Sequence, residues 1–218
     1  MEFDSVIYDL DGTLLDTAPG IIESVKYTIN LLGFTPMTDK EMHAFIGPPL
    51  SESFQKYCGC NLKEADRAVA IFRDFYQKEA LLNAIPYDGI YECFQLLSEA
   101  GFRMSVATNK PERFALRLMN HFRFDRYLRA IHGADEDGKL RKADLIRLCI
   151  RETGGTTSTS VVVGDTVSDA KGARETGVSF LAVSYGFGFR TNEDLKELSC
   201  IGIADSPRQI AAILLNKT

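Results

Sequence analysis

The chain of 218 residues lacks any apolar run near the roughly 18 to 20 residues that a membrane-spanning helix needs. Its first residues are acidic, where a secretory signal would be basic. Its five cysteines are odd in number and lack the regular spacing of a disulfide framework. We therefore expect a cytoplasmic protein without a membrane partner.

The sequence also lacks a zinc-site pattern and a surplus of basic residues, which argues against two classes of function. The pair Cys58 and Cys60 lacks the second Cys or His pair that a zinc site needs. A formal net charge of -5 leaves no surplus of Lys and Arg for nucleic acid, and the arginines between Arg113 and Arg129 alternate with apolar residues, as on a solvated helix face. We expect no nucleic-acid partner, and either a monomer or a weak homodimer.

Short apolar runs alternate with helical patterns along most of the chain. The runs expected as buried strands are Ser5 to Asp9, Arg103 to Thr108, Ser160 to Val163 and, more weakly, Ser179 to Val183. The helical stretches between them are Gly89 to Ala100, Pro111 to His121 and Lys142 to Glu152. This alternation predicts an α/β fold with a doubly wound parallel sheet, whose ligands bind beyond the carboxyl ends of the strands.

The strand pattern disappears between Asp16 and about Leu82. Four helical stretches replace it: Ile21 to Leu32, Asp39 to Phe45, Leu50 to Tyr57 and Lys63 to Leu82. We predict two domains, an α/β core of residues 1–15 and 83–218 and an inserted α-helical cap of residues 16–82. Because the insert begins just after a strand's carboxyl end, we expect it to act as a lid over the site.

Two carboxylates follow the first buried strand. Asp9 and Asp11 lie two residues apart, and Gly12 after them permits a tight turn. Such a pair could be a turn signal alone, because Asp-Gly is a common turn dipeptide. It could also present two acids at the edge of the sheet.

Polar residues also follow two later strands. Thr108 and Asn109 come at a strand end before a helix, where a hydroxyl and free amides can hold phosphate oxygens or merely cap the helix. Asp165 ends another strand and Asp169 follows one helical turn later, so both can face one point, as Mg²⁺ ligands do. Three strands thus bring acids and phosphate-binding groups to one edge.

The ordered motifs resemble those of the haloacid dehalogenase superfamily of phosphatases. They stand at Asp9 to Asp16, Thr108 to Pro111 and Gly164 to Asp169. Together with the insert after the first motif, they place the chain near the phosphoglycolate phosphatase-like branch over almost its whole length. The resemblance implies a Rossmann-like core with a helical cap.

The remaining motif of that family is a single lysine. We assign it to Lys142, at the head of a predicted helix. The family often has a proline next, and this chain has Ala143, so Lys139 stays as the alternative.

The resemblance implies a magnesium-dependent phosphate-monoester hydrolase that works through a phosphorylated aspartate. Asp9 would be the nucleophile, and Asp11 the acid and base that protonates the leaving group and then activates water. A dehalogenase would not need this second acid. Lys142 would balance the negative charge. The expected substrate is a small phosphorylated metabolite, phosphoglycolate or a nucleoside monophosphate first.

The same resemblance implies the binding residues. Thr108, Asn109 and the amide of Gly12 would join Lys142 in holding the phosphate oxygens. Mg²⁺ would be bound by Asp9, the main-chain carbonyl of Asp11 and Asp165, and Asp169 would orient this set from outside it.

Two other functions stay open. A sugar-phosphate mutase of the β-phosphoglucomutase type shares these motifs, although the cap loop Phe45 to Leu50 resembles that of phosphatases and lacks the arginine usual in mutases. A non-catalytic binding protein could keep the fold, but the intact acids and lysine argue against it. Turnover of an aryl phosphate with Mg²⁺ would separate the classes.

Overall fold

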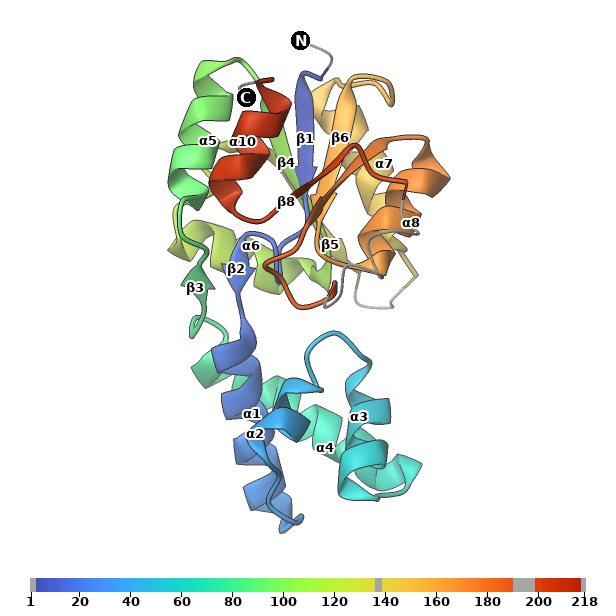
Figure 1. The fold of residues 1–218 in the computed structure, drawn as a ribbon. Coiled ribbons are helices and arrows are strands. Elements are labelled where there is room, and N and C mark those ends of the chain that lie inside the picture. Colours follow the sequence, from blue (N-terminus) through green and yellow to red (C-terminus); the bar gives the residue numbers. More distant parts are fainter. Residues whose placement is uncertain (1–2, 136–138, 190–198, 217–218) are drawn as a thin grey trace. The chain divides into compact units, whose positions relative to one another are not determined.

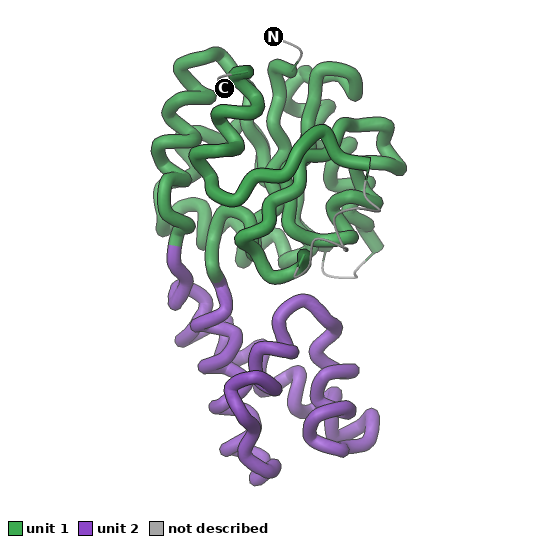
Figure 2. The backbone as a smooth tube through the Cα atoms, viewed as in Figure 1, with its two compact units in different colours: residues 1–16, 86–218 green, residues 17–85 purple. Residues whose placement is uncertain are grey.

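The computed structural model describes residues 3–135, 139–189 and 199–216. It divides into two compact units, residues 1–16 with 86–218 and residues 17–85 (Figure 2). The first holds the sheet and the second is helical (Figure 1). No helix in the described part of the chain is both long and apolar enough to cross a membrane.

A parallel sheet of six strands forms the first unit. In spatial order it consists of β5 (Leu128–Ala134), β4 (Arg103–Pro111), β1 (Ser5–Tyr8), β6 (Ser160–Gly164), β7 (Ser179–Val183) and β8 (Gly202–Ala204). Its described helices are α5 (Ile90–Glu99), α6 (Glu112–His121), α7 (Lys142–Thr153), α8 (Val167–Thr176) and α10 (Pro207–Leu214). The predicted doubly wound α/β fold is confirmed.

Helices cover the two faces of this sheet (Figure 1). Alternate strand residues such as Ile7 and Val162 pack on one face against α7 and α8. On the other face Tyr8 of β1 meets Phe94 of α5 edge to face, at 5.5 Å between ring centroids, and α5 packs on α10. Burial on both faces explains why the central strands are continuous apolar runs.

The order of the strands determines where a ligand can bind. β1 lies between β4 and β6, so the chain winds outward from β1 in both directions. Such a switch point leaves a crevice beyond the carboxyl ends of the central strands. The predicted acids stand at this edge.

The sequence patterns missed two strands of the sheet. β8 has only three residues, and β5 carries Arg129 and His132 among its few apolar residues. Both lie at the edges of the sheet, where a strand has a neighbouring strand on one side only. An edge strand is less enclosed than a central one, so its sequence need not be a continuous apolar run. β4 also runs beyond Thr108, its expected end, to Pro111.

The second unit is a bundle of short helices. They are α1 (Ala18–Leu32), α2 (Asp39–His43), α3 (Leu50–Cys58), α4 (Leu62–Phe75) and the π-helical turn η1 (Tyr76–Ala80). The last two replace the single helix expected from Lys63 to Leu82. Gly20 of α1 explains part of the packing, because a Cβ there would collide with the Ala80 carbonyl.

Two short strands join the units. β2 (Leu15–Asp16) pairs with β3 (Ile85–Pro86), so the chain leaves and re-enters the first unit through neighbouring segments. The predicted boundaries lay at residues 15/16 and 82/83, and contacts divide the chain at 16/17 and 85/86.

Candidate active site

Asp9 is the first residue beyond β1, and only 7% of it is exposed. Its amide donates to the carbonyl of Val163 at 2.8 Å, which holds its backbone at the edge of the sheet. The Nζ of Lys142 lies 2.5 Å from Asp9 Oδ1 and donates to the Ala107 carbonyl at 2.7 Å. A carboxylate on a rigid strand end thus faces a buried ammonium group.

Lys142 also contacts a second carboxylate. Its Nζ lies 2.7 Å from Oδ1 of Asp169, while the other oxygen of Asp169 accepts from the amide of Thr166 at 3.0 Å in a helix-capping box. A side chain at Gly172 would overlap Lys142, so this glycine of α8 leaves room for the lysine. The ion pair between Lys142 and Asp169 therefore joins the start of α7 to the start of α8.

Asp165 is held by backbone amides that the sequence analysis did not identify. Its Oδ2 accepts from the amides of Phe187 at 2.7 Å and Gly188 at 3.1 Å. A Cβ on Gly12 or Gly186 would collide with the Asp165 side chain. Gly12 and Gly186 thus enclose this carboxylate. Gly12 also has a φ of 83°, a conformation that favours glycine.

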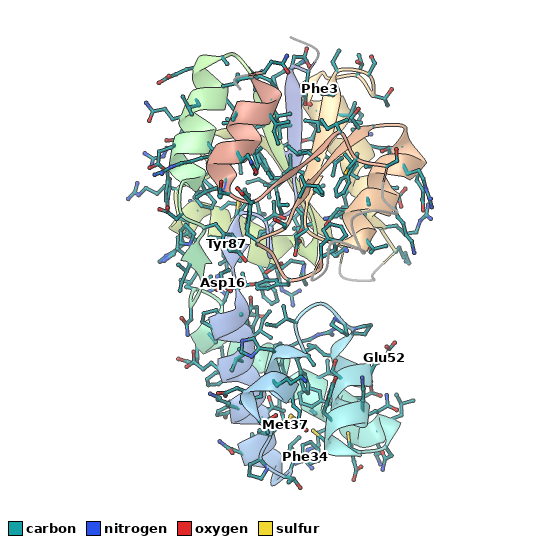
Figure 3. The ribbon with its side chains drawn as sticks, in the orientation of Figure 1. Phe3, Asp16, Phe34, Met37, Glu52 and Tyr87 are labelled. Carbon is teal, nitrogen blue, oxygen red and sulfur yellow. The ribbon has the colours of Figure 1, made fainter. Side chains whose placement is uncertain are left out.

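The signal for that loop was present in the sequence. Gly186 and Gly188 follow the carboxyl end of β7, at the edge where ligands bind. The hydroxyl of Tyr185 donates to the Thr13 carbonyl at 2.9 Å, and its ring lies 4.7 Å from that of Tyr87, which Figure 3 labels. This loop braces the turn that follows Asp9.

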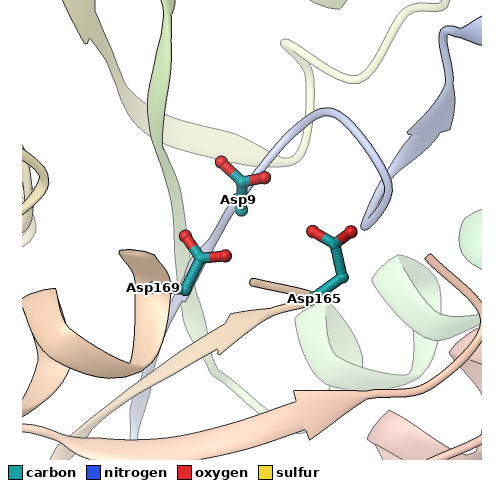
Figure 4. Close-up of side chains that lie close together, drawn as sticks. All are labelled: Asp9, Asp165 and Asp169. Atoms are coloured by element: carbon teal, nitrogen blue, oxygen red, sulfur yellow. The ribbon is translucent and has the colours of Figure 1, made fainter. Parts of the chain in front are cut away.

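Three carboxylates from different elements converge at this point (Figure 4). Oxygens of Asp9, Asp165 and Asp169, all buried, lie within 4.8 Å of one another. Burial raises the pKa of Asp9 well above its usual range, and the two neighbouring carboxylates add to the rise while Lys142 opposes it. Burial and the Asp169 charge raise the pKa of Asp165 to about 6. The cluster carries more negative charge than Lys142 offsets.

The pKa of Lys142 supports a charged pair. Burial by itself would lower that pKa, but the charges of Asp169 and Asp9 outweigh burial and hold it above its ordinary value. Lys139, the alternative from the sequence, is exposed at the surface. The structure therefore places Lys142 against Asp9.

The expected phosphate-binding residues lie at the same edge. Thr108 is buried, with its hydroxyl accepting from the amide of Lys110 at 3.1 Å, and Asn109 donates to the hydroxyl of Ser168 at 3.1 Å. The amide of Gly12 donates to the Leu15 carbonyl at 2.9 Å. That donor, which we predicted for phosphate, is engaged in the turn here.

Asp11 has a partner that sequence reasoning missed. Lys110 Nζ lies 2.7 Å from Asp11 Oδ1. The two residues are 99 positions apart in sequence, so no local spacing indicates the contact.

The cap loop from Phe45 to Leu50, which resembles those of phosphatases, is buried at its start and exposed in its middle. Phe45 and Ile46 are buried within the helical unit, and the Phe45 ring lies 5.0 Å from that of Phe54. The Gly47-Pro48-Pro49 turn is exposed. Within this loop, Pro48 and Pro49 can therefore contact a ligand without unpacking the unit.

The comparisons with known proteins identify the family of this chain. The model of the haloacid dehalogenase-like hydrolase family matches residues 6–183. A 5'-nucleotidase from Pseudomonas aeruginosa is 35% identical over 189 residues, 86% of each chain. A phosphoglycolate phosphatase from Agrobacterium fabrum is 32% identical over 188 residues, 83% of this chain and 80% of that one.

Two further relatives share the fold. The tyrosine-protein kinase PtkA of Mycobacterium tuberculosis is 33% identical over 185 residues, which span 84% of this chain but 62% of that protein. A solved haloacid dehalogenase-like hydrolase from Streptococcus pneumoniae is 29% identical with a TM-score of 0.88, covering 98% of this chain and 99% of that one. The chain therefore belongs to the haloacid dehalogenase-like hydrolase family, among its phosphatases.

Proposed function

We propose that the protein hydrolyses small phosphate monoesters through a phosphorylated Asp9, with Mg²⁺ as cofactor. The observation that carries this proposal is the buried convergence of Asp9, Lys142, Asp165 and Asp169 at the carboxyl edge of the sheet. Burying such a cluster is costly, because each uncompensated charge loses its hydration. Buried ionisable groups with strongly shifted pKa values gather at functional sites, so the cluster points to a function.

The carboxylate set fits a hard divalent cation. Three carboxylate oxygens within 4.8 Å form a hard-oxygen donor set. Burial, and after it the neighbouring carboxylates, raises the pKa values of Asp9 and Asp165, and a bound cation would favour their charged forms. We propose Asp9, Asp165 and the main-chain carbonyl of Asp11 as its ligands. Asp169, bound to Lys142 and Thr166, would orient the set. When bound, Mg²⁺ would neutralise charge on the phosphate and let the dianion approach.

The first half of the reaction makes the covalent intermediate. The Asp9 carboxylate attacks phosphorus in line, the bond from phosphorus to the leaving oxygen breaks, and Asp11 gives that oxygen a proton. Thr108 and Asn109 would bind the phosphate oxygens as they gain charge, and Lys142 would balance the added negative charge at Asp9. Because these groups stand on strand and helix ends, little reorganisation is needed.

The second half restores the enzyme. Asp11, now ionised, takes a proton from a water molecule that attacks the phosphorus of the Asp9 acyl phosphate. The bond between Asp9 and phosphorus breaks, inorganic phosphate leaves, and Asp11 holds the proton needed for the next turnover. One residue thus serves as acid and then base.

Nucleoside monophosphates and phosphoglycolate are the first substrates to test, since two relatives described above are named 5'-nucleotidase and phosphoglycolate phosphatase. A panel of phosphate esters that includes sugar phosphates, assayed for released phosphate with Mg²⁺ and with EDTA, tests the proposal. Release that EDTA abolishes supports it. Conversion of a sugar phosphate to its isomer without phosphate release favours the mutase alternative. Transfer to tyrosine from a nucleotide with no hydrolysis of any ester contradicts the hydrolase function.

Asp165→Asn should stabilise the metal-free protein. The folded-state pKa of Asp165, about 6, exceeds the ordinary carboxyl value of 3.8, so the folded protein loses stability as the pH rises from 3.8 through 6. The amide has no charge to bury, so the free energy of unfolding of the variant should exceed that of the wild type by about 3 kcal/mol above pH 6 and should equal it below pH 4.

Denaturant unfolding in EDTA across this pH range measures the effect. Exposed Asp205→Asn is the matched control and should follow the wild type. Added Mg²⁺ should raise the melting temperature of the wild type and of Asp205→Asn but not of Asp165→Asn. A variant that is less stable than the wild type at neutral pH in EDTA would contradict the electrostatic account.

A further inference from the structure

We propose that Lys110 is a positioning residue that holds Asp11 in the orientation for proton transfer to the leaving group. The inference rests on the proposed role of Asp11 as general acid. Lys110 itself would contact neither the phosphate nor the leaving group.

The contact between the two side chains is short and shielded. Lys110 Nζ lies 2.7 Å from Asp11 Oδ1, with 8% of the lysine side chain and 25% of the aspartate side chain exposed. A pair with such limited exposure is screened less than a surface ion pair, which usually contributes little. Asp11 stands in the turn after β1, so this contact to β4 ties its carboxylate to the neighbouring strand.

The backbone of β4 is shaped to present this lysine. The pairing of β4 with β5 joins Thr108 to Gly133 and Pro111 to Ala134, so the two residues between Thr108 and Pro111 have no partner residues on β5. A bulge of this kind beside a site redirects side chains. Lys110, one of the two, is thereby directed to the β1 side of β4.

Two contacts hold that backbone in place. The amide of Lys110 donates to the Thr108 hydroxyl at 3.1 Å. A Cβ at Gly133 would collide with the backbone of Glu112 and crowd the Lys110 carbonyl, so a glycine is needed for β5 to approach so closely. The cation that faces Asp11 is therefore carried by a strand of the sheet.

A fixed general acid matters most when the leaving oxygen is basic. An alkoxide needs the proton in the transition state, whereas a nitrophenolate leaves without it. Loss of the Asp11 orientation should therefore slow esters with poor leaving groups and spare esters with good ones. A lysine needed only for folding, or only to attract phosphate, would affect all esters alike.

The test uses Lys110→Met, which keeps most of the length of the side chain and removes the charge. We expect kcat/KM to fall by roughly 10-fold to 10²-fold for an alkyl phosphate and by no more than about 3-fold for 2,4-dinitrophenyl phosphate. kcat/KM is the appropriate constant because it reports phosphoryl transfer to Asp9 and excludes the later hydrolysis. Lys171→Met, at an exposed position of α8, is the matched control and should leave both values unchanged.

The double variant with Asp11→Asn decides between the explanations. If Lys110 acts through Asp11, Lys110→Met should have no further effect in the Asp11→Asn background. An equal loss for all esters, or a loss that persists in that background, would overturn the positioning role. If Asp11→Asn itself shows no preference among leaving groups, the general-acid assignment fails and the inference fails with it. Circular dichroism and thermal unfolding of each variant show whether the fold is retained.

Discussion

Replacing Asp9 by Asn is expected to abolish turnover while the fold remains. The amide has nearly the shape of the carboxylate and can keep its place beyond β1, but it cannot attack phosphorus or form an acyl phosphate. We expect kcat to fall by at least about 10⁴-fold, as for other enzymes that lose their nucleophile. Initial rates on an aryl phosphate measure the loss.

A second measurement addresses the covalent intermediate directly. Rapid acid quench during turnover should leave a phosphoryl group on the wild-type protein and none on Asp9→Asn, as read by intact mass. Asp4→Asn, an exposed position just before β1, is the control and should keep the label and the rate. A labelled and active Asp9→Asn protein would remove Asp9 from the mechanism.

Replacing Lys142 by Met should cost both stability and activity. Only 5% of the Lys142 side chain is exposed, and its ammonium group contacts the buried carboxylates of Asp9 and Asp169. Removing one partner of a buried ion pair leaves an uncompensated charge, which typically costs about 3 to 5 kcal/mol. We expect that loss in denaturant unfolding at neutral pH, together with a large fall in kcat/KM.

Lys139→Met is the matched control for this variant and also tests the alternative assignment. Lys139 is exposed, so its substitution should change the free energy of unfolding by less than about 0.5 kcal/mol and leave turnover intact. The reverse result, an inactive Lys139→Met beside an active Lys142→Met, would transfer the role to Lys139.

In the helical unit, the structure shows which side chains of a loop are exposed, and the sequence resemblance does not. The loop from Phe45 to Leu50 resembles that of phosphatases, but Phe45 and Ile46 are packed inside the unit. An Ile46→Ala substitution would first remove core contacts, so a change in substrate preference would be hard to interpret. Pro48, in the exposed turn, is the better position for such a test.

The sequence by itself determined the fold class and the edge of the sheet at which the candidate acids lie. Buried parallel strands are short apolar runs, and the acids that follow β1 and β6 are adjacent to those runs in the chain. Local patterns of this kind can be seen without a structure, because strand periodicity and turn residues act over a few positions. The edge strands β5 and β8 lack such a pattern, so they were missed.

Only the tertiary structure decided which side chains meet at that edge. Lys142 reaches Asp9 across 133 positions, Lys110 reaches Asp11 across 99, and the amide of Phe187 reaches Asp165 across 22. Each contact depends on the order of the strands, on a bulge or on a glycine that allows close approach, and none of these is a local property of the chain. Local spacing therefore predicted the acids of the site, whereas packing selected the groups that hold and neutralise them.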